Sequence, residues 1–223
     1  MRTSTYIFLI LLTFLTFCEQ APPEATADFQ VTIENLTGTE VAPAAMLGSG
    51  VLYRQSFGSP MFFNRSPDYG DGLEQLAEDG NSGPLVLNLG FREEILEFDS
   101  FDNIMPGGSV AFSFRAEYGN RLNFATMFMQ SNDLFYSFND EGISLFEPSG
   151  DPINGDFTSK VHLWDIGSEE NEPPYLGDFQ PPRQAEPGEG VFTPAEVVRP
   201  RDDSFEYPSV SAVIRITVTS QSL

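Results

Sequence analysis

The sequence contains one cysteine, one histidine and one lysine in 223 residues, and each scarcity limits the possible chemistry. A single cysteine excludes a disulfide framework. One cysteine and one histidine cannot supply the nitrogen and sulfur ligands of a tetrahedral zinc site. His162 is the only histidine that could activate a serine nucleophile, and it lies in the strand-like stretch "KVHLW". We therefore interpret His162 as a packed or half-exposed side chain, and nucleophilic hydrolase chemistry is disfavoured.

Positive charge is also scarce, because 11 Lys and Arg residues face 33 Asp and Glu residues and leave a formal net charge of -22. Nucleic-acid binding depends on cationic side chains that neutralise phosphates, so this charge excludes a general nucleic-acid binder. It also argues against docking on anionic lipid. A surface this acidic suits a protein that stays soluble in salt or that collects cations.

The N-terminus carries the longest apolar run of the chain. Arg2 is followed by apolar residues from Tyr6 to Phe17 and then by Cys18. This is the layout of a secretory signal peptide, and the run is too short to span a bilayer comfortably. Cys18 resembles the lipidated cysteine of a bacterial lipoprotein, although Phe17 stands where a small residue is usual. The alternative is a leftover cysteine in an ordinary signal peptide.

Residues 19–28, "EQAPPEATAD", predict a flexible tether. We therefore expect export, either as a lipoprotein of the cell envelope or outer surface or as a secreted protein. Contact with a membrane would be made only through the lipid on Cys18.

Short alternating runs separated by Gly and Pro turns make up most of residues 29–220. "FQVTIENL" (29–36), "SVAFSFRAEY" (109–118) and "AVIRITVTS" (212–220) each place apolar residues on one face, as half-buried strands do. "RLNFATMFM" (121–129) is apolar on both faces, and we expect it to be fully buried. The last run could pair with the first, so that both termini close one sheet. This pattern predicts an all-β fold, an antiparallel β-sandwich.

Two more apolar runs, "PLVLNLGF" and "SKVHLWD", are further strand candidates. The sequence predicts one short helix, Asp71 to Asp79, in "DYGDGLEQLAEDGN", with Asp71 as N-cap and Gly80 as a left-handed C-cap. Between Ile166 and Arg201 the composition changes to Pro, Glu and Gly, which predicts a long loop. Loops of that length are usually functional or mobile.

Two polar segments at strand ends are candidates for binding a hard cation. Calcium takes six to eight oxygen ligands, and loops at one end of a β-sandwich can supply them. Asp133 follows the doubly buried run, and Asp165 and Glu169 flank a predicted turn at Gly167. Asn132 is interpreted as a turn former. The alternative for each acid is an ordinary solvated carboxylate at a strand end.

The order of these landmarks resembles the spondin N-terminal domain, which occurs in animal matrix proteins and in bacterial secreted proteins. The matching segments are "FQVTIENLT", "GLEQLAEDGN", "PGGSVAFSF", "RLNFATMFMQSNDLF" and "LWDIGSEEN", which together extend over most of the chain after the tether. The resemblance implies a β-sandwich related to C2 and immunoglobulin-like domains. It also implies a calcium ion at one end, held by Asp133, Asp165 and Glu169. Ile166 departs from the alanine usual in the last motif, and the cysteines of the animal members are missing.

Two functions follow as expectations. The first is a non-catalytic, calcium-binding module for binding or adhesion at the cell surface, with an extracellular protein or polysaccharide as partner. The second is an extracellular hydrolase that uses clustered carboxylates, although acids are so abundant here that any pair of them is a weak signal. A hydrolase needs a concave, partly apolar pocket beside its acids, whereas a structural calcium site lies at an exposed loop end.

Overall fold

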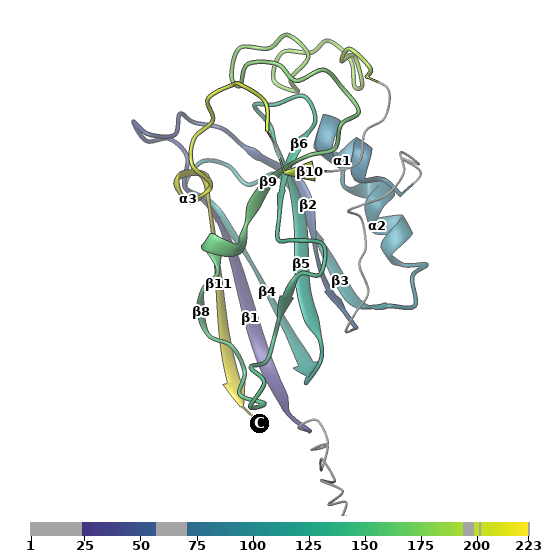
Figure 1. Cartoon of the computed structure of the whole chain (residues 1–223), viewed down its shortest axis with the longest axis vertical. Coiled ribbons are helices and arrows are strands. Elements are labelled where there is room, and N and C mark those ends of the chain that lie inside the picture. Colours follow the sequence, from purple (N-terminus) through teal and green to yellow (C-terminus); the bar gives the residue numbers. More distant parts are fainter. Residues whose placement is uncertain (1–23, 57–70, 194–198, 201, 223) are drawn as a thin grey trace, which may run out of the picture.

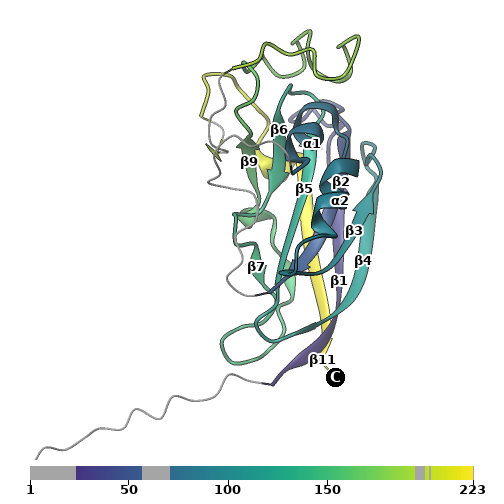
Figure 2. The same cartoon turned by 90° about the vertical axis from the view of Figure 1, so that its right-hand side faces the viewer.

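The computed structural model describes residues 24–56, 71–193, 199–200 and 202–222, which form two antiparallel sheets packed face to face (Figures 1 and 2). The smaller sheet has the order β4 (Ser109–Glu117), β1 (Thr26–Asn35), β11 (Ile214–Ser222) and β8 (Gly155–Asp156). The larger sheet has the order β10 (Arg199–Pro200), β9 (His162–Asp165), β6 (Leu134–Ser137), β5 (Arg121–Phe128), β2 (Leu47–Gln55) and β3 (Ile95–Phe101), and β7 (Ile143–Ser144) pairs with β5. The predicted all-β sandwich is confirmed.

The two terminal strands pair along their whole length in the smaller sheet. Val31 lies opposite Val218 and Ile33 opposite Ile216, and all four side chains are buried between the sheets. The predicted closure of one sheet by both ends of the chain is therefore confirmed. Strand β1 begins at Thr26, so the last three residues of the expected tether belong to the sheet.

Strand β5 is buried on both faces, as its sequence predicts. Phe124 faces the smaller sheet within the main core. Ala125 points the other way, into a second cluster with Leu76 and Leu85 beneath two helices. Figure 2 shows these helices, α1 (Leu73–Asp79) and α2 (Gly83–Leu89), lying against the outer face of the larger sheet. This double packing fixes the position of the end of β5.

Helix α1 ends at Gly80, which has the left-handed conformation expected of a C-cap, with φ of 65°. Asp71 does not occupy the N-cap position; that residue is Gly72, and the Asp71 carboxylate accepts a hydrogen bond from the Leu73 amide at 3.1 Å. Four residues apart, Leu85 and Leu89 both pack on the sheet from α2.

Two expectations about secondary structure are wrong. The run "PLVLNLGF" forms α2 rather than a strand, because Pro84 suits the first helical turn and its buried leucines recur at helical spacing. The expectation of a single helix is wrong for the same reason, and a short helix α3 (Val210–Val213) and a 3-10 turn η1 (Thr158–Lys160) are also present.

The predicted long loop covers one end of the larger sheet, at the top of Figure 1. Residues 167–193 contain no helix and only an isolated bridge between Glu169 and Phe192. The Thr193 amide donates to the Ser168 carbonyl at 2.9 Å, which ties the far end of this segment to its start. The predicted signal peptide, Cys18 and residues 19–23 of the expected tether lie outside the described residues. Within the described part of the chain, no helix is long and apolar enough to cross a membrane.

Candidate metal centre

Two neighbouring strands bring the predicted site residues to one end of the larger sheet. Strands β6 and β9 are antiparallel, with Leu134 opposite Asp165, so the residue before β6 and the last residue of β9 are adjacent. The Ile166 amide donates to the Asp133 carbonyl at 3.3 Å. Ser131 holds the preceding turn, because its hydroxyl donates to the Phe128 carbonyl at 2.7 Å. The sequence prediction that Asp133 and Asp165 lie close together agrees with this arrangement.

Asp133 is fully buried, with 0% of its surface exposed. Its Oδ2 accepts a hydrogen bond from the Glu169 amide at 3.2 Å. Its Oδ1 has no hydrogen-bond partner among the described residues. Burial raises the pKa of Asp133 well above its usual range, and the negative charge of Asp165 raises it further. One oxygen of a buried carboxylate is thus left without a donor.

Asp165 closes the turn that the sequence places at Gly167. Its Oδ1 accepts from the Gly167 amide at 2.7 Å, and its Oδ2 accepts from the Asn171 side chain at 2.8 Å. Gly167 has φ of 74°, a left-handed conformation that reverses the chain direction at little cost only for glycine. The turn brings the Glu169 amide back to the Asp133 carboxylate.

The Glu169 carboxylate is enclosed by the long loop. The Asn132 side chain donates to its Oε2 at 3.3 Å, and a methyl group on Gly190 would come within 1.8 Å of its Cδ. Burial raises the pKa of Glu169 to about 7, and Asp79 and Glu172 add to the rise. Glu169 is therefore held between Asn132 and the far end of the loop.

Asn132 organises the loop as well as the turn. Its Nδ2 donates to the Glu170 carbonyl at 2.9 Å, and its Oδ1 accepts from the Glu172 amide at 3.2 Å. Only 1% of the surface of Asn132 is exposed. Its side chain provides the hydrogen-bond partners that the backbone groups of Glu170 and Glu172 would otherwise find in secondary structure. Asn132 lies in the bend before β6, where a turn former is expected, and its side chain also binds the loop.

Glu78 is a fourth acidic residue at this end of the sheet, and it was not among the predicted ligands. It lies in the last turn of α1, and only 9% of its surface is exposed. Burial raises its pKa to about 7; the Ser168 hydroxyl opposes this, while Glu169 and two other acids add to it. The sequence "LAEDG" could have indicated this residue. Two acids in the last turn of a helix interact unfavourably with the negative end of the helix dipole, so another interaction must favour them.

The oxygen atoms at this end of the sheet are suitable ligands for a hard cation. Carboxylate and amide oxygens are the ligands that calcium prefers, and buried Asp133 Oδ1 and Asn171 Oδ1 both lack donors among the described residues. Asp133, Glu169 and Glu78 form no ion pair with a described Lys or Arg. However, within the part of the chain that the structure describes, no three His, Cys, Asp or Glu side chains surround a common point. The acids gather here without forming a closed cage.

A scan against models of known protein families finds no match to this chain, and a search of curated proteins finds none either. The resemblance to the spondin N-terminal domain therefore rests on the five sequence segments quoted above and stays a prediction.

Proposed function

We propose that this protein is an exported, non-catalytic binding module of the spondin N-terminal type, whose loop end is stabilised by calcium. The observation that carries the calcium proposal is the fully buried Asp133 carboxylate, with one oxygen that lacks a donor, beside three other acids. Asp133, Asp165 and Glu169 would hold the ion, with Asn171 as a source of amide oxygen. These side chains would supply the negative charge that attracts the ion and would fix its position.

Calcium would act by cancelling repulsion among carboxylates. Without a cation, buried acids this close can avoid repulsion only by keeping protons, which agrees with the raised pKa values of Asp133, Glu169 and Glu78. A bound ion would also fix the loop 167–193 on the end of the sheet, since Glu169 belongs to that loop. At tenfold excess over the dissociation constant, binding would add about 1.4 kcal/mol to the free energy of unfolding.

The module would present its fixed loops to an extracellular protein or polysaccharide. A net charge of -22 favours neutral or cationic partner surfaces and disfavours nucleic acid. A lipid on Cys18, followed by the tether, would keep the domain near the cell envelope.

The test is thermal unfolding of the protein in millimolar calcium and in chelator, for the wild type and for Asp133→Asn. We expect calcium to raise the melting temperature of the wild type by roughly 2–5 °C and to leave Asp133→Asn unshifted. In chelator, Asp133→Asn should melt no lower than the wild type, because the amide keeps the shape of the carboxyl group and cannot ionise. The matched control is Asp99→Asn, an exposed acid on β3, which should keep the full calcium shift. Equal melting of the wild type with and without calcium would refute the proposal.

A carboxylate-based extracellular hydrolase is the alternative function, and one observation favours it. Glu78 and Glu169, each with a pKa raised to about 7, have the protonation behaviour that a general acid needs near neutral pH. Glu169→Gln would then abolish release of reducing sugars from an extracellular polysaccharide, and the exposed control Asp99→Asn would leave that release unchanged. The absence of turnover by the wild type on a polysaccharide panel would leave the binding module as the better explanation.

A further inference from the structure

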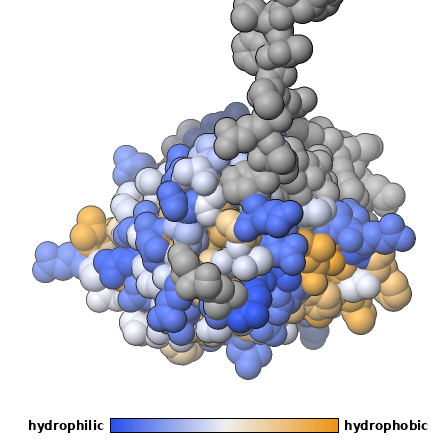
Figure 3. Space-filling view, turned by 90° about the horizontal axis from the view of Figure 1, so that it is seen from below, coloured by the Kyte–Doolittle hydropathy of each residue, from blue (hydrophilic) through white to orange (hydrophobic). Residues whose placement is uncertain are grey.

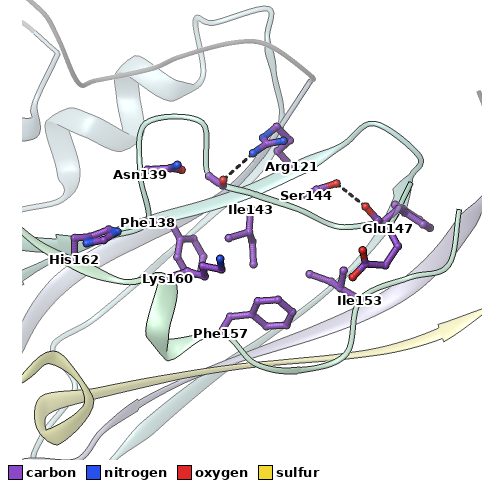
Figure 4. A pocket seen from close by; sticks show the side chains of 12 residues that line it. Arg121, Phe138, Asn139, Ile143, Ser144, Glu147, Ile153, Phe157, Lys160 and His162 are labelled. Carbon is purple, nitrogen blue, oxygen red and sulfur yellow. Dashed lines mark hydrogen bonds between the residues drawn. The ribbon is translucent and has the colours of Figure 1, made fainter. Parts of the chain in front are cut away.

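A second site lies at the opposite end of the strand pair that carries the acids. The same β6–β9 ladder that places Leu134 beside Asp165 places Ser137 beside His162 at its other end. There the structure has a pocket of about 540 Å³, bounded by β7, the segment that follows it, and the 3-10 turn η1 (Figure 4). Its volume lies in the range of pockets that bind small organic molecules.

The floor of this pocket is apolar. Phe138, Ile143 and Ile153 are all at least nine-tenths buried, yet each lines the hollow, and Phe157 closes one side. In Figure 4 these side chains lie between His162 at one end of the pocket and Glu147 at the other. Such a surface gains free energy when it is covered by an apolar body of matching size.

Cationic and imidazole side chains gather around this floor. The pocket is lined by the only lysine of the chain, Lys160, by its only histidine, His162, and by Arg121. Arg121 is already engaged, because its guanidinium donates to the Glu141 and Gly142 carbonyls and thereby holds the loop before β7. Lys160 is directed into the hollow beside Phe138 and Ile143 (Figure 4).

Lys160 differs from most described cations in having no carboxylate partner. Five other described cations pair with acids: Arg54 with Glu97, Arg92 with Glu94, Arg115 with Asp28, Arg121 with Glu141, and Arg215 with Glu34. Lys160 forms no ion pair with any acid in the described ranges. Lys160 and His162 are both exposed at the pocket, so each side chain can reach a ligand held there.

We infer that this pocket binds a small organic anion with an apolar body. The anionic head pairs with Lys160 and accepts a hydrogen bond from His162, while the body covers Ile143, Ile153 and Phe157. Glu147 lines the far side of the pocket, so a second negative charge at that end would be repelled. The site therefore selects an amphipathic monoanion over a dianion or a neutral apolar molecule.

The test compares two fluorescent probes that differ in one anionic group, 1-anilinonaphthalene-8-sulfonate and neutral N-phenyl-1-naphthylamine. We expect the purified full-length protein to bind the sulfonate saturably and more tightly than the neutral probe. Lys160→Gln should weaken sulfonate binding by about tenfold, the effect of losing one charge-assisted hydrogen bond. Lys160→Arg should keep most of the affinity, and Lys160→Gln should not change binding of the neutral probe.

Arg115→Gln is the matched control, since it removes an exposed cation from β4 of the other sheet. Exposed apolar side chains also bind such probes, and they gather on the side of the molecule that carries α2 (Figure 3), where Leu87 and Phe91 are 68% and 86% exposed. This background binding of the probes should be the same in every variant. Equal sulfonate affinity of Lys160→Gln and the wild type would overturn the inference, as would equal affinity of the wild type for both probes. Running the titrations in chelator separates this result from the calcium proposal, on which it does not depend.

Discussion

At the scale of single residues, the acidic end is a set of carboxylates held where ionisation is unfavourable. Removing a carboxylate from water costs free energy unless donors or a cation compensate, and Asp133 receives one backbone donor for its two oxygens. Burial is the largest cause of the raised pKa values of Glu78 and Glu169, and it outweighs the Ser168 hydroxyl and the Asn132 side chain, which lower them. The stability of the protein should therefore depend on pH in a characteristic direction.

In chelator, we expect the free energy of unfolding to fall as pH rises from about 5 to about 8. Glu78 and Glu169 titrate near 7 in the folded state and near 4.5 when unfolded, so the folded state holds more protons in this window. The loss should be at least about 1 kcal/mol, or roughly 2–4 °C in melting temperature. Thermal melts at several pH values measure it.

The same melts with Glu78→Gln should show a shallower fall, because one of the titrating groups is gone. Glu93→Gln, an exposed acid outside the site, should leave the wild-type slope unchanged. Saturating calcium should flatten the profile, since the cation competes with the protons. A stability that rises steadily with pH in chelator would contradict the assignment.

At the scale of elements, the strands and α1 could be predicted because their signals are local. Alternation at Val31 and Ile216 and the left-handed Gly80 depend only on near neighbours in the chain. The secondary structure of the run around Leu85 could not be predicted correctly. A short apolar segment is compatible with a buried strand and with a buried helix, and only its packing partner decides between them. Glu78 was missed because its burial depends on the loop that begins at Ile166, which is far away in the sequence.

The long loop depends on one close approach that only the folded structure shows. The Glu169 carboxylate lies against Gly190, where any side chain would collide with it. We expect Gly190→Ala to displace this carboxylate and to loosen residues 167–193, with faster amide hydrogen exchange there and a melting temperature lower by a few degrees.

Gly90→Ala is the control for this substitution. Gly90 has helical backbone angles with φ of -65°, and the nearest contact of an added methyl group is an ordinary 3.5 Å. It should leave exchange in the loop unchanged and should not lower the melting temperature. Unchanged exchange in Gly190→Ala would mean that Glu169 does not anchor the loop.

At the scale of the whole molecule, one strand pair separates two regions of opposite chemistry. Asp133 and Asp165 lie at one end of the β6–β9 ladder, and His162 lies at the other, only three residues along β9. A ladder of that length spans about 10 Å, so neither site can shift without moving the strands that carry the other. Both sites therefore depend on the rigidity of the sandwich, which the pairing of the two chain ends provides.

This dependence predicts that a core substitution in β11 unfolds the whole domain in one step. Ile216→Ala removes a side chain that is 1% exposed and packed between the sheets, and should lower the free energy of unfolding by about 2–5 kcal/mol. The single tryptophan, Trp164, lies in β9 of the other sheet and reports on that sheet alone. Its fluorescence and the far-ultraviolet circular dichroism should therefore shift to lower denaturant concentration together. Thr219→Ala, an exposed position on the same strand, should change stability by less than about 0.5 kcal/mol. If the fluorescence transition stayed in place while the circular dichroism transition moved, the two sheets would be separate folding units and the mutual dependence of the two sites would be wrong.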